Sequence, residues 1–243
     1  MKLKTGITEK YKEVINKLNI LALDCAVTRI SRAVKTETKF ISTTYDIGMR
    51  QSEILVPAID EILKKAEITA AELNASALTI GPGSFTGLRL GISALKAIEL
   101  AYNVPVYGIS SLENYAFPYK NFGIPLLSCI DANKDKFYAR ITNGEKLLLK
   151  DDDYELEKIS EAVKNIETIC ICGPDAVKLS EKLQAIYTAK NFLIPAVSSQ
   201  TAESLIKITE NLIEKKAEPL KDFDGPVYLR ASEAELKLQG TIS

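Results

Sequence analysis

Short runs of consecutive apolar residues alternate along the chain with helical stripes of apolar residues. The runs predict buried strands, and the stripes, in which apolar residues recur every three or four positions, predict amphipathic helices. In the first half of the chain the predicted strands are 19–24, 29–34, 39–45, 75–81 and 104–108, and the predicted helices are 52–66 and 86–102. The first three strands have tight connections, which favours an antiparallel meander.

The second half of the chain repeats this order of elements. Its predicted strands are 125–131, 136–142, 145–150 and 169–174, and its predicted helices are 155–165 and one that starts at Asp175. In each half a strand closes on an aspartate, and a later strand runs into Gly-Pro before a helix. We interpret this as an internal duplication of a βββαβα unit. The predicted fold class is α/β, with two lobes around a cleft as in the actin, Hsp70 and sugar-kinase (ASKHA) superfamily.

This interpretation divides the chain into three segments. An N-terminal extension covers 1–18 and contains a short amphipathic helix at 8–18. The first lobe is 19–117 and the second lobe is 118–243. The second lobe ends with a predicted helix at 201–216, which could pack back on the first lobe.

The composition excludes several classes of enzyme and metal site. The chain contains no histidine, so it cannot form a Ser-His-Asp triad, a Cys-His pair or a histidine-bound metal site. The four cysteines lie in or beside apolar runs, which predicts core positions rather than metal ligands; they are Cys25, Cys129, Cys170 and Cys172. A net charge of −1 gives the chain no overall attraction to nucleic acid. The polar, Lys-rich N-terminus lacks the apolar region of a signal peptide, which predicts a cytoplasmic protein.

Two aspartates at strand ends are the first candidate site. Asp24 and Asp131 close the corresponding strands of the two halves, and across a cleft they would hold magnesium and position a nucleotide phosphate. An aspartate after a strand can equally serve to cap or turn the chain. Both interpretations stay open at this stage.

A glycine-rich segment before the helix at 86–102 is the second candidate site. Its residues Gly81, Gly83, Ser84 and Thr86 precede or open a helix, whose N-terminal N–H groups suit an anion such as a nucleotide phosphate. The segment is not a Walker loop, because no lysine follows the last glycine. The alternative is that the glycines allow a strand and a helix to pack closely.

The helix at 86–102 is apolar on nearly all sides. Its polar residues form one narrow stripe, namely Arg89, Ser93, Lys96 and Glu99. Such a helix must be buried on more than one side, and a sheet covers only one of them. Its small residues Gly91, Ala94, Ala97 and Ala101 favour close approach of another helix, either within the same lobe or across a subunit interface.

Several longer motifs resemble one family. They are Ile20-Leu-Ala-Leu-Asp24, Gln51-Ser-Glu-Ile-Leu-Val-Pro57, Gly81-Pro-Gly-Ser-Phe-Thr-Gly-Leu-Arg-Leu-Gly91, Pro105-Val-Tyr-Gly-Ile-Ser-Ser-Leu-Glu113, Ile130-Asp-Ala132 and Val227-Tyr-Leu-Arg-Ala-Ser-Glu-Ala-Glu235. Together they are similar to the TsaB family, also called YeaZ, from about Asn19 to Glu235. The sequence departs from the family pattern at Gln51, where histidine is usual, at Cys25, where threonine is usual, and in the extension at 1–18.

The resemblance implies a non-catalytic bacterial protein of the Hsp70-like superfamily that works with TsaD and TsaE. That complex transfers the threonylcarbamoyl group from an AMP adduct made by TsaC to the adenosine 3′ of the anticodon in tRNAs that read codons starting with A. The implied subunit is not an enzyme by itself, holds no metal, meets tRNA through the complex and has ATP or ADP only at the complex interface.

The resemblance also implies that helices of the first lobe bind TsaD and allow a homodimer to form when the chain is alone. The residues expected at this surface are Ser52, Leu55, Ile59, Leu88, Gly91, Leu95 and Ile98. The alternative hypothesis is a stand-alone kinase or ATPase of the same fold that uses Asp24 and Asp131 with magnesium.

Overall fold

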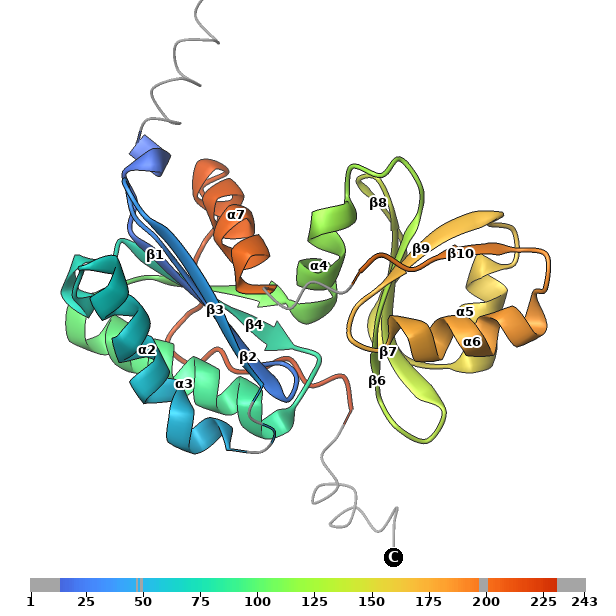
Figure 1. The fold of residues 1–243 in the computed structure, drawn as a ribbon, viewed down its shortest axis with the longest axis horizontal. Helices are drawn as coiled ribbons and strands as arrows, with labels where there is room; N and C mark the ends of the chain where they lie inside the picture. Colours follow the sequence, from blue (N-terminus) through green and yellow to red (C-terminus); the bar gives the residue numbers. More distant parts are fainter. Residues whose placement is uncertain (1–13, 47, 49, 197–200, 231–243) are drawn as a thin grey trace, which may run out of the picture. The chain divides into compact units, whose positions relative to one another are not determined.

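The structure is a computed structural model that describes residues 14–46, 48, 50–196 and 201–230. The described chain forms two compact units (Figure 1). Unit 1 contains the chain up to Pro118 and the part between residue 201 and Pro226. Unit 2 contains the chain from Tyr119 to residue 196 and from Val227 to Arg230. The predicted second lobe is therefore not continuous, because its C-terminal helix belongs to unit 1.

Unit 1 is built on a five-stranded mixed sheet with the strand order β3-β2-β1-β4-β5. The strands are β1 (Ile20–Asp24), β2 (Arg29–Lys35), β3 (Phe40–Asp46), β4 (Ala75–Gly81) and β5 (Val106–Ser110). β1, β2 and β3 form the predicted antiparallel meander, which is confirmed. β4 and β5 then join in parallel.

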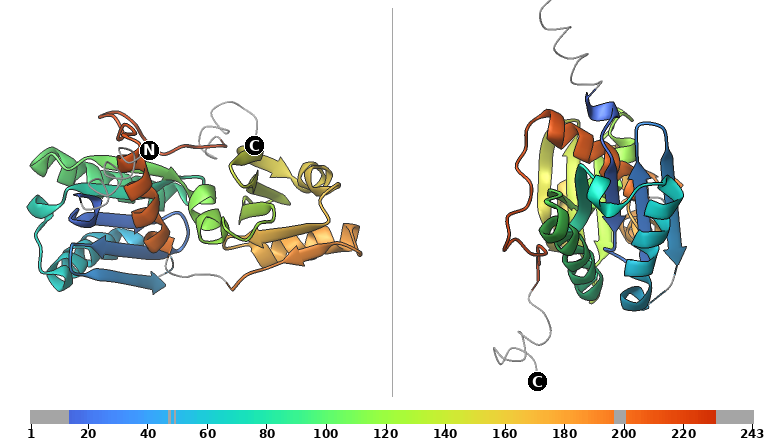
Figure 2. Two further views of the ribbon diagram at one scale, coloured as in Figure 1. Left: turned by 90° about the horizontal axis from the view of Figure 1, so that it is seen from above. Right: turned by 90° about the vertical axis from the view of Figure 1, so that its left-hand side faces the viewer.

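Helices cover both faces of this sheet. α2 (Gln51–Ala66) and α3 (Phe85–Tyr102) pack on one face, and α7 (Thr201–Glu214) packs on the other (Figure 1). The alternation along β1 explains this arrangement, because Leu21 and Leu23 enter the core under α2 and α3 whereas Ile20 and Ala22 enter the core under α7. Figure 2 shows α7, which is late in the sequence, beside the strands that begin the chain.

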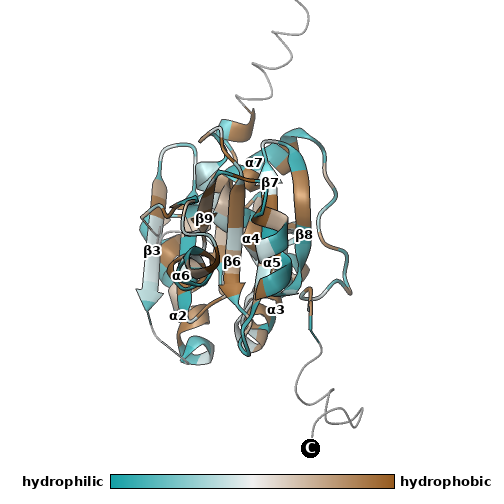
Figure 3. Cartoon of the chain, turned by 90° about the vertical axis from the view of Figure 1, so that its right-hand side faces the viewer, coloured by the Kyte–Doolittle hydropathy of each residue, from teal (hydrophilic) through white to brown (hydrophobic). Residues whose placement is uncertain are grey.

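Unit 2 repeats the topology of unit 1, with the strand order β10-β9-β6-β7-β8. The elements are β6 (Leu126–Asp131), β7 (Lys136–Asn143), β8 (Lys146–Glu155), α5 (Leu156–Val163), β9 (Thr168–Cys172), α6 (Ala176–Ile186) and β10 (Asn191–Leu193). α5 and α6 pack on one face of the sheet. Figure 3 shows the central strand β6 as hydrophobic, whereas α5 and α6 combine hydrophobic and hydrophilic residues. The predicted duplicated α/β fold is confirmed.

Some element boundaries differ from those expected from the sequence. β5 begins at Val106 rather than at residue 104, because Pro105 has no N–H for the sheet ladder. β8 continues to Glu155, since its residues 152–155 pair with residues 136–139 of β7 and Tyr154 packs on the core of unit 2. The apolar pattern of the sequence does not predict β10 or the short helix α4 (Ser111–Ala116).

The predicted helix at 8–18 lies mostly outside the described residues, as does the end of the last family motif, from residue 231. Within the described part, Ile15 is buried, and its carbonyl oxygen accepts a hydrogen bond of 2.9 Å from the Lys35 ammonium. No described helix combines the length and the apolar character needed to cross a membrane.

A buried arginine fastens α2 to the meander. Arg32 on β2 is fully buried and donates hydrogen bonds to Thr43, to the Tyr45 hydroxyl and to the Glu61 carboxylate on α2. Lys65 also donates to Glu61, at 2.6 Å. These contacts hold the carboxylate in its ionised form.

The hydrogen bonds to Glu61 predict that the free energy of unfolding falls at acid pH. Hydrogen bonds from Lys65, Tyr45 and Arg32 lower the pKa of Glu61 from 4.5 to about 2. A lowered pKa in the folded state adds stability above the unfolded pKa, and this stability is lost as the pH falls from about 4.5 towards 2. In chemical denaturation between these values, we expect the unfolding free energy of wild type to fall more steeply than that of Glu61→Gln. Parallel pH profiles for the two proteins would contradict this expectation.

Candidate functional site

The glycine-rich segment packs directly on the turn between β1 and β2. A Cβ atom at Gly83 would lie 2.3 Å from the Ala26 carbonyl oxygen, and one at Gly87 would lie 2.2 Å from the Cys25 carbonyl oxygen. The Ser84 N–H donates to the same Ala26 oxygen at 2.7 Å. Glycine is therefore needed here because two backbone segments touch, which is the packing alternative left open by the sequence.

The remaining polar groups of this segment are also engaged or exposed. The Ser84 hydroxyl caps α3 by accepting a hydrogen bond of 3.2 Å from the Gly87 N–H. Thr86 is exposed on the first turn of α3. Gly81 has a φ of 125°, a conformation that favours glycine. The prediction that Gly81, Gly83, Ser84 and Thr86 bind a nucleotide stays a prediction, and the Ser84 hydroxyl has a local structural role.

Asp24 is sealed inside unit 1. Its side chain is 2% exposed. One carboxylate oxygen accepts hydrogen bonds from the Thr79 hydroxyl at 2.9 Å and from the Ala26 N–H at 3.0 Å. The other oxygen accepts a hydrogen bond from the Thr201 hydroxyl at the start of α7. In this arrangement Asp24 joins three elements of the fold, and its oxygens do not fit the role of a magnesium or phosphate ligand.

This bonding predicts that Asp24→Asn destabilises unit 1. An asparagine amide cannot accept all three hydrogen bonds, and a buried hydrogen bond to a charged group is worth about 2 kcal/mol. We expect chemical denaturation to show a loss of this size. Asp46→Asn, at an exposed strand end, is the matched control and should change stability by less than about 0.5 kcal/mol. Equal stabilities of Asp24→Asn and wild type would refute a structural role.

Asp131, the counterpart of Asp24 in unit 2, pairs with α6. Its carboxylate accepts a hydrogen bond from the Lys178 ammonium, and its backbone N–H donates to the Asp175 carboxylate at 2.8 Å. The Asp131 carboxylate also accepts the Asn133 N–H at 3.0 Å, which closes the turn after β6. The hydrogen bond to Asp131 raises the pKa of Lys178. Both strand-end aspartates thus have protein partners within their own units.

All four cysteines are buried, as the sequence predicts. Burial is the largest cause that raises the pKa of the Cys25 and Cys172 thiols, and the Asp24 carboxylate raises the pKa of Cys25 further. A thiol must ionise to act as a nucleophile. The cysteines are therefore structural residues of the two cores.

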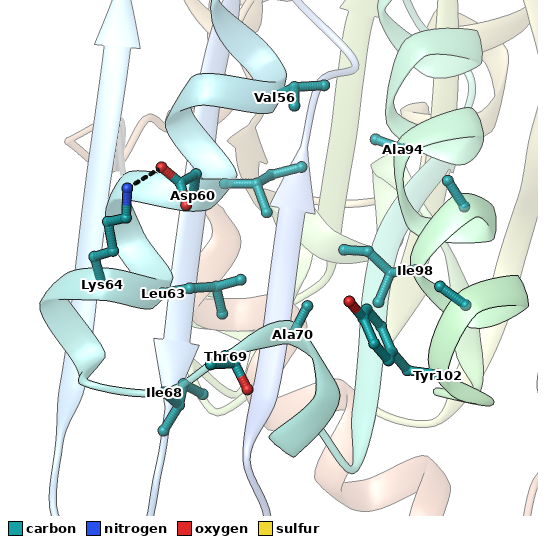
Figure 4. A pocket seen from close by; sticks show the side chains of 13 residues that line it. Val56, Asp60, Leu63, Lys64, Ile68, Thr69, Ala70, Ala94, Ile98 and Tyr102 are labelled. Atoms are coloured by element: carbon teal, nitrogen blue, oxygen red, sulfur yellow. Dashed lines mark hydrogen bonds and ion pairs between the residues drawn. The ribbon is translucent and has the colours of Figure 1, made fainter.

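A groove on the surface of unit 1 is a candidate for binding a partner. It lies between α2, α3 and the short helix η1 (Ala70–Glu72) and has a volume of about 470 Å³ (Figure 4). The lining is mostly apolar, and one charged pair, Asp60 and Lys64, lies at its edge (Figure 4). Val56 and Tyr102 line it and are 64% and 51% exposed. Exposed apolar surface of this kind is typical of an interaction site.

Only part of the predicted partner surface lies at this groove. Ile59 and Ile98 line it, and Ser52 is exposed on the first turn of α2. The remaining four residues are buried under the two helices and form no surface: Leu55, Leu88, Gly91 and Leu95. The physical reason is that these residues face the sheet, so the next stripe of α3, with Ala94, Ala97 and Ala101, lines the groove.

Comparison with known proteins identifies the family. Residues 48–237, more than half of the chain, match a family model described as TsaD: tRNA N6-adenosine threonylcarbamoyltransferase. The chain belongs to the TsaD family. Its predicted resemblance to TsaB, or YeaZ, is confirmed by relatives that it matches over nearly their full length.

Three of these relatives illustrate the similarity. The tRNA threonylcarbamoyladenosine biosynthesis protein TsaB of Bacillus subtilis is 25% identical, over 90% of this chain and 97% of its own. The Escherichia coli protein of the same name is 26% identical, over 92% of this chain and 99% of its own. The solved structure of YeaZ from Pseudomonas aeruginosa covers 87% of this chain and 100% of its own with a TM-score of 0.70 at 22% identity, which shows a common fold.

Several residues at the groove of this TsaD-family chain are not predicted from its sequence. Ile68, Thr69 and Ala70 come from the connection after α2, and Tyr102 comes from the last turn of α3 (Figure 4). A capping box, in which Thr69 and Glu72 exchange hydrogen bonds, was the available signal for η1. No sequence signal places that connection between the two helices.

Proposed function

We propose that this chain is a non-catalytic scaffold and activating subunit in tRNA threonylcarbamoyladenosine biosynthesis. The full-length relatives named TsaB support the process. The observation that carries the scaffold role is the exposed apolar groove between α2 and α3. In this proposal the groove binds a TsaD-like catalytic subunit.

The small side chains of α3 support this choice of partner. Ala94, Ala97 and Ala101 line the groove, and small residues allow another helix to approach closely. The family model that this chain matches is that of TsaD itself, so a TsaD-like subunit can present a related helix pair to the groove. A stable contact should bury at least about 1,000 Å² in total. A second copy of this chain is the expected occupant when the TsaD-like subunit is absent.

The chemistry of the side chains supports a subunit without catalysis of its own. The chain has no histidine, its cysteines are buried, and Asp24 is fully hydrogen-bonded inside unit 1. We therefore expect any ATP or ADP at the assembled complex, together with a TsaE-like ATPase. Because the net charge of −1 gives no overall attraction to RNA, we expect tRNA to meet this subunit through the complex. The proposed location is the cytoplasm.

The alternative, a stand-alone nucleotide-dependent kinase or ATPase, has less support. Asp24 and Asp131, which would bind magnesium, are both engaged by groups of their own units. No observation on the described residues favours this enzyme over the scaffold. It would require ATP turnover by the isolated chain that disappears in Asp24→Asn while the folded state persists.

Reconstitution tests the proposed function. Threonylcarbamoyl transfer to tRNA is measured with TsaD-like and TsaE-like subunits, with and without this chain, and complex formation is followed by size exclusion with light scattering. We expect stable association with the TsaD-like subunit and transfer that depends on this chain. Full transfer without it, or no association, would overturn the proposal.

A further inference from the structure

One arginine fastens the last described residues of the chain to unit 2. The Nε and Nη2 atoms of Arg230 both lie 2.8 Å from the same carboxylate oxygen of Asp153 on β8. The Nη1 atom donates to the Ala132 carbonyl oxygen at 2.9 Å. The guanidinium therefore joins the strand β8 to the turn that connects β6 and β7.

That turn has an unusual backbone. Asn133, Lys134 and Asp135 are consecutive residues with φ values of 61°, 53° and 58°. Residues with side chains adopt this left-handed conformation at a cost in energy, so the turn depends on contacts that hold it. Besides Arg230 at Ala132, the Asp131 carboxylate accepts the Asn133 N–H, and Lys182 pairs with Asp135 at 2.8 Å.

The buried carboxylate of Asp153 has Arg230 as its cationic partner. Its side chain is 13% exposed, and its second carboxylate oxygen is buried with no hydrogen-bond partner among the described groups. A buried carboxylate is costly unless an opposite charge pairs with it. Removal of the guanidinium would therefore disturb β8 and the turn together.

We propose that Arg230 is a positioning residue that sets the conformation of the β6–β7 turn, and with it the orientation of Asp131, from the C-terminal part of the chain. This inference goes beyond the proposed function, because it concerns unit 2 alone and does not involve the groove. It explains why the position carries arginine. One planar guanidinium reaches Asp153 and Ala132 at once, whereas a lysine ammonium is a single point of charge.

Residue-resolved hydrogen exchange on the full chain tests this role. The Ala132 N–H donates to the Lys136 carbonyl at 3.0 Å, and the Lys136 N–H donates to the Asn133 carbonyl at 3.1 Å. In Arg230→Met we expect both amides to exchange at least tenfold faster, with amides at the centre of β6 unchanged. Arg230→Lys should not restore slow exchange.

A second measurement separates a role in positioning Asp131 from a general loss of stability in unit 2. The hydrogen bond to Asp131 raises the pKa of Lys178, so an NMR titration of the Lys178 ammonium reports the orientation of Asp131 in the folded protein. We expect this pKa to fall towards its ordinary value in Arg230→Met. If that variant fails to fold, Asp153→Asn is measured instead, with the same expectations.

Arg140→Met is the matched control. Arg140 lies on β7, in the same sheet as Asp153, and pairs with Asp151. Its side chain is 22% exposed, against 28% for Arg230. Arg140→Met should leave the exchange rates of the two turn amides and the pKa of Lys178 unchanged. Unchanged exchange in Arg230→Met, equal acceleration in Arg140→Met, or full restoration in Arg230→Lys would each overturn the proposal.

Discussion

Ala97→Glu is expected to abolish association with a TsaD-like subunit while the chain stays folded. Ala97 is exposed and lines the groove between α2 and α3, and glutamate is a good helix former. In the free protein the new carboxylate is solvated, whereas a partner seated in the groove would bury it. Burying an unpaired charge costs several kcal/mol. We expect the dissociation constant to rise at least a hundredfold, which corresponds to a loss of about 2.8 kcal/mol in binding free energy.

Ser93→Glu is the control for this experiment. Ser93 is exposed on the same helix but does not line the groove, so the same charge there should leave binding within about twofold. Binding is measured by titration calorimetry, and folding by circular dichroism. Light scattering on the isolated chain should show that Ala97→Glu also reduces self-association. If Ala97→Glu binds the TsaD-like subunit as wild type does, the groove is not the interface.

Gly87→Ala is expected to destabilise unit 1 by about 3 kcal/mol or more. The new methyl group would lie 2.2 Å from the Cys25 carbonyl oxygen and 2.6 Å from the Gln51 side-chain oxygen. Gln51 is itself held, because its amide donates to the Val27 carbonyl at 2.6 Å. α3 would have to move away from the β1–β2 turn, and overpacking of this severity outweighs the gain in helix propensity.

Gly91→Ala, one turn further along α3, provides the comparison. A Cβ atom there lies 3.5 Å or more from Leu78 and Cys25, which is ordinary contact. We expect this variant to equal wild type or to gain up to about 1 kcal/mol from helix propensity. Thermal and chemical denaturation measure both variants. Similar stabilities for Gly87→Ala and Gly91→Ala would show that the loop does not need glycine for packing.

Much of the fold could be predicted from local patterns. The alternation of apolar runs and helical stripes predicted nearly all strands and helices and the duplication, because each element buries the face that its own sequence makes apolar. The pattern failed at β8, whose second half is acidic and joins the sheet through backbone pairing with β7, from Asp152 opposite Ala139 to Glu155 opposite Lys136. It also missed α4, although Ser110 caps its first turn.

The candidate site could be predicted only in outline. The sequence placed the predicted partner surface on the two helices that border the groove, but it included Leu55, Leu88 and Leu95, which are buried. A helix that is apolar on nearly all sides does not reveal which stripe faces the sheet. That choice is made by packing, since the sheet covers the stripe that contains Leu88 and Leu95 and leaves the alanine stripe of α3 to the groove.

The sequence by itself determined the duplicated α/β fold, the family and the absence of histidine chemistry. These follow from local patterns, motifs and composition, which do not depend on distant contacts. Only the tertiary structure decided which groups the candidate residues contact. Asp24 is sealed by Thr201, a residue that α7 brings back to the first sheet, and Arg230 reaches Ala132 and Asp153. Hydrogen-bond partners this far apart in sequence meet only after the chain has folded, so no spacing along the chain could predict them.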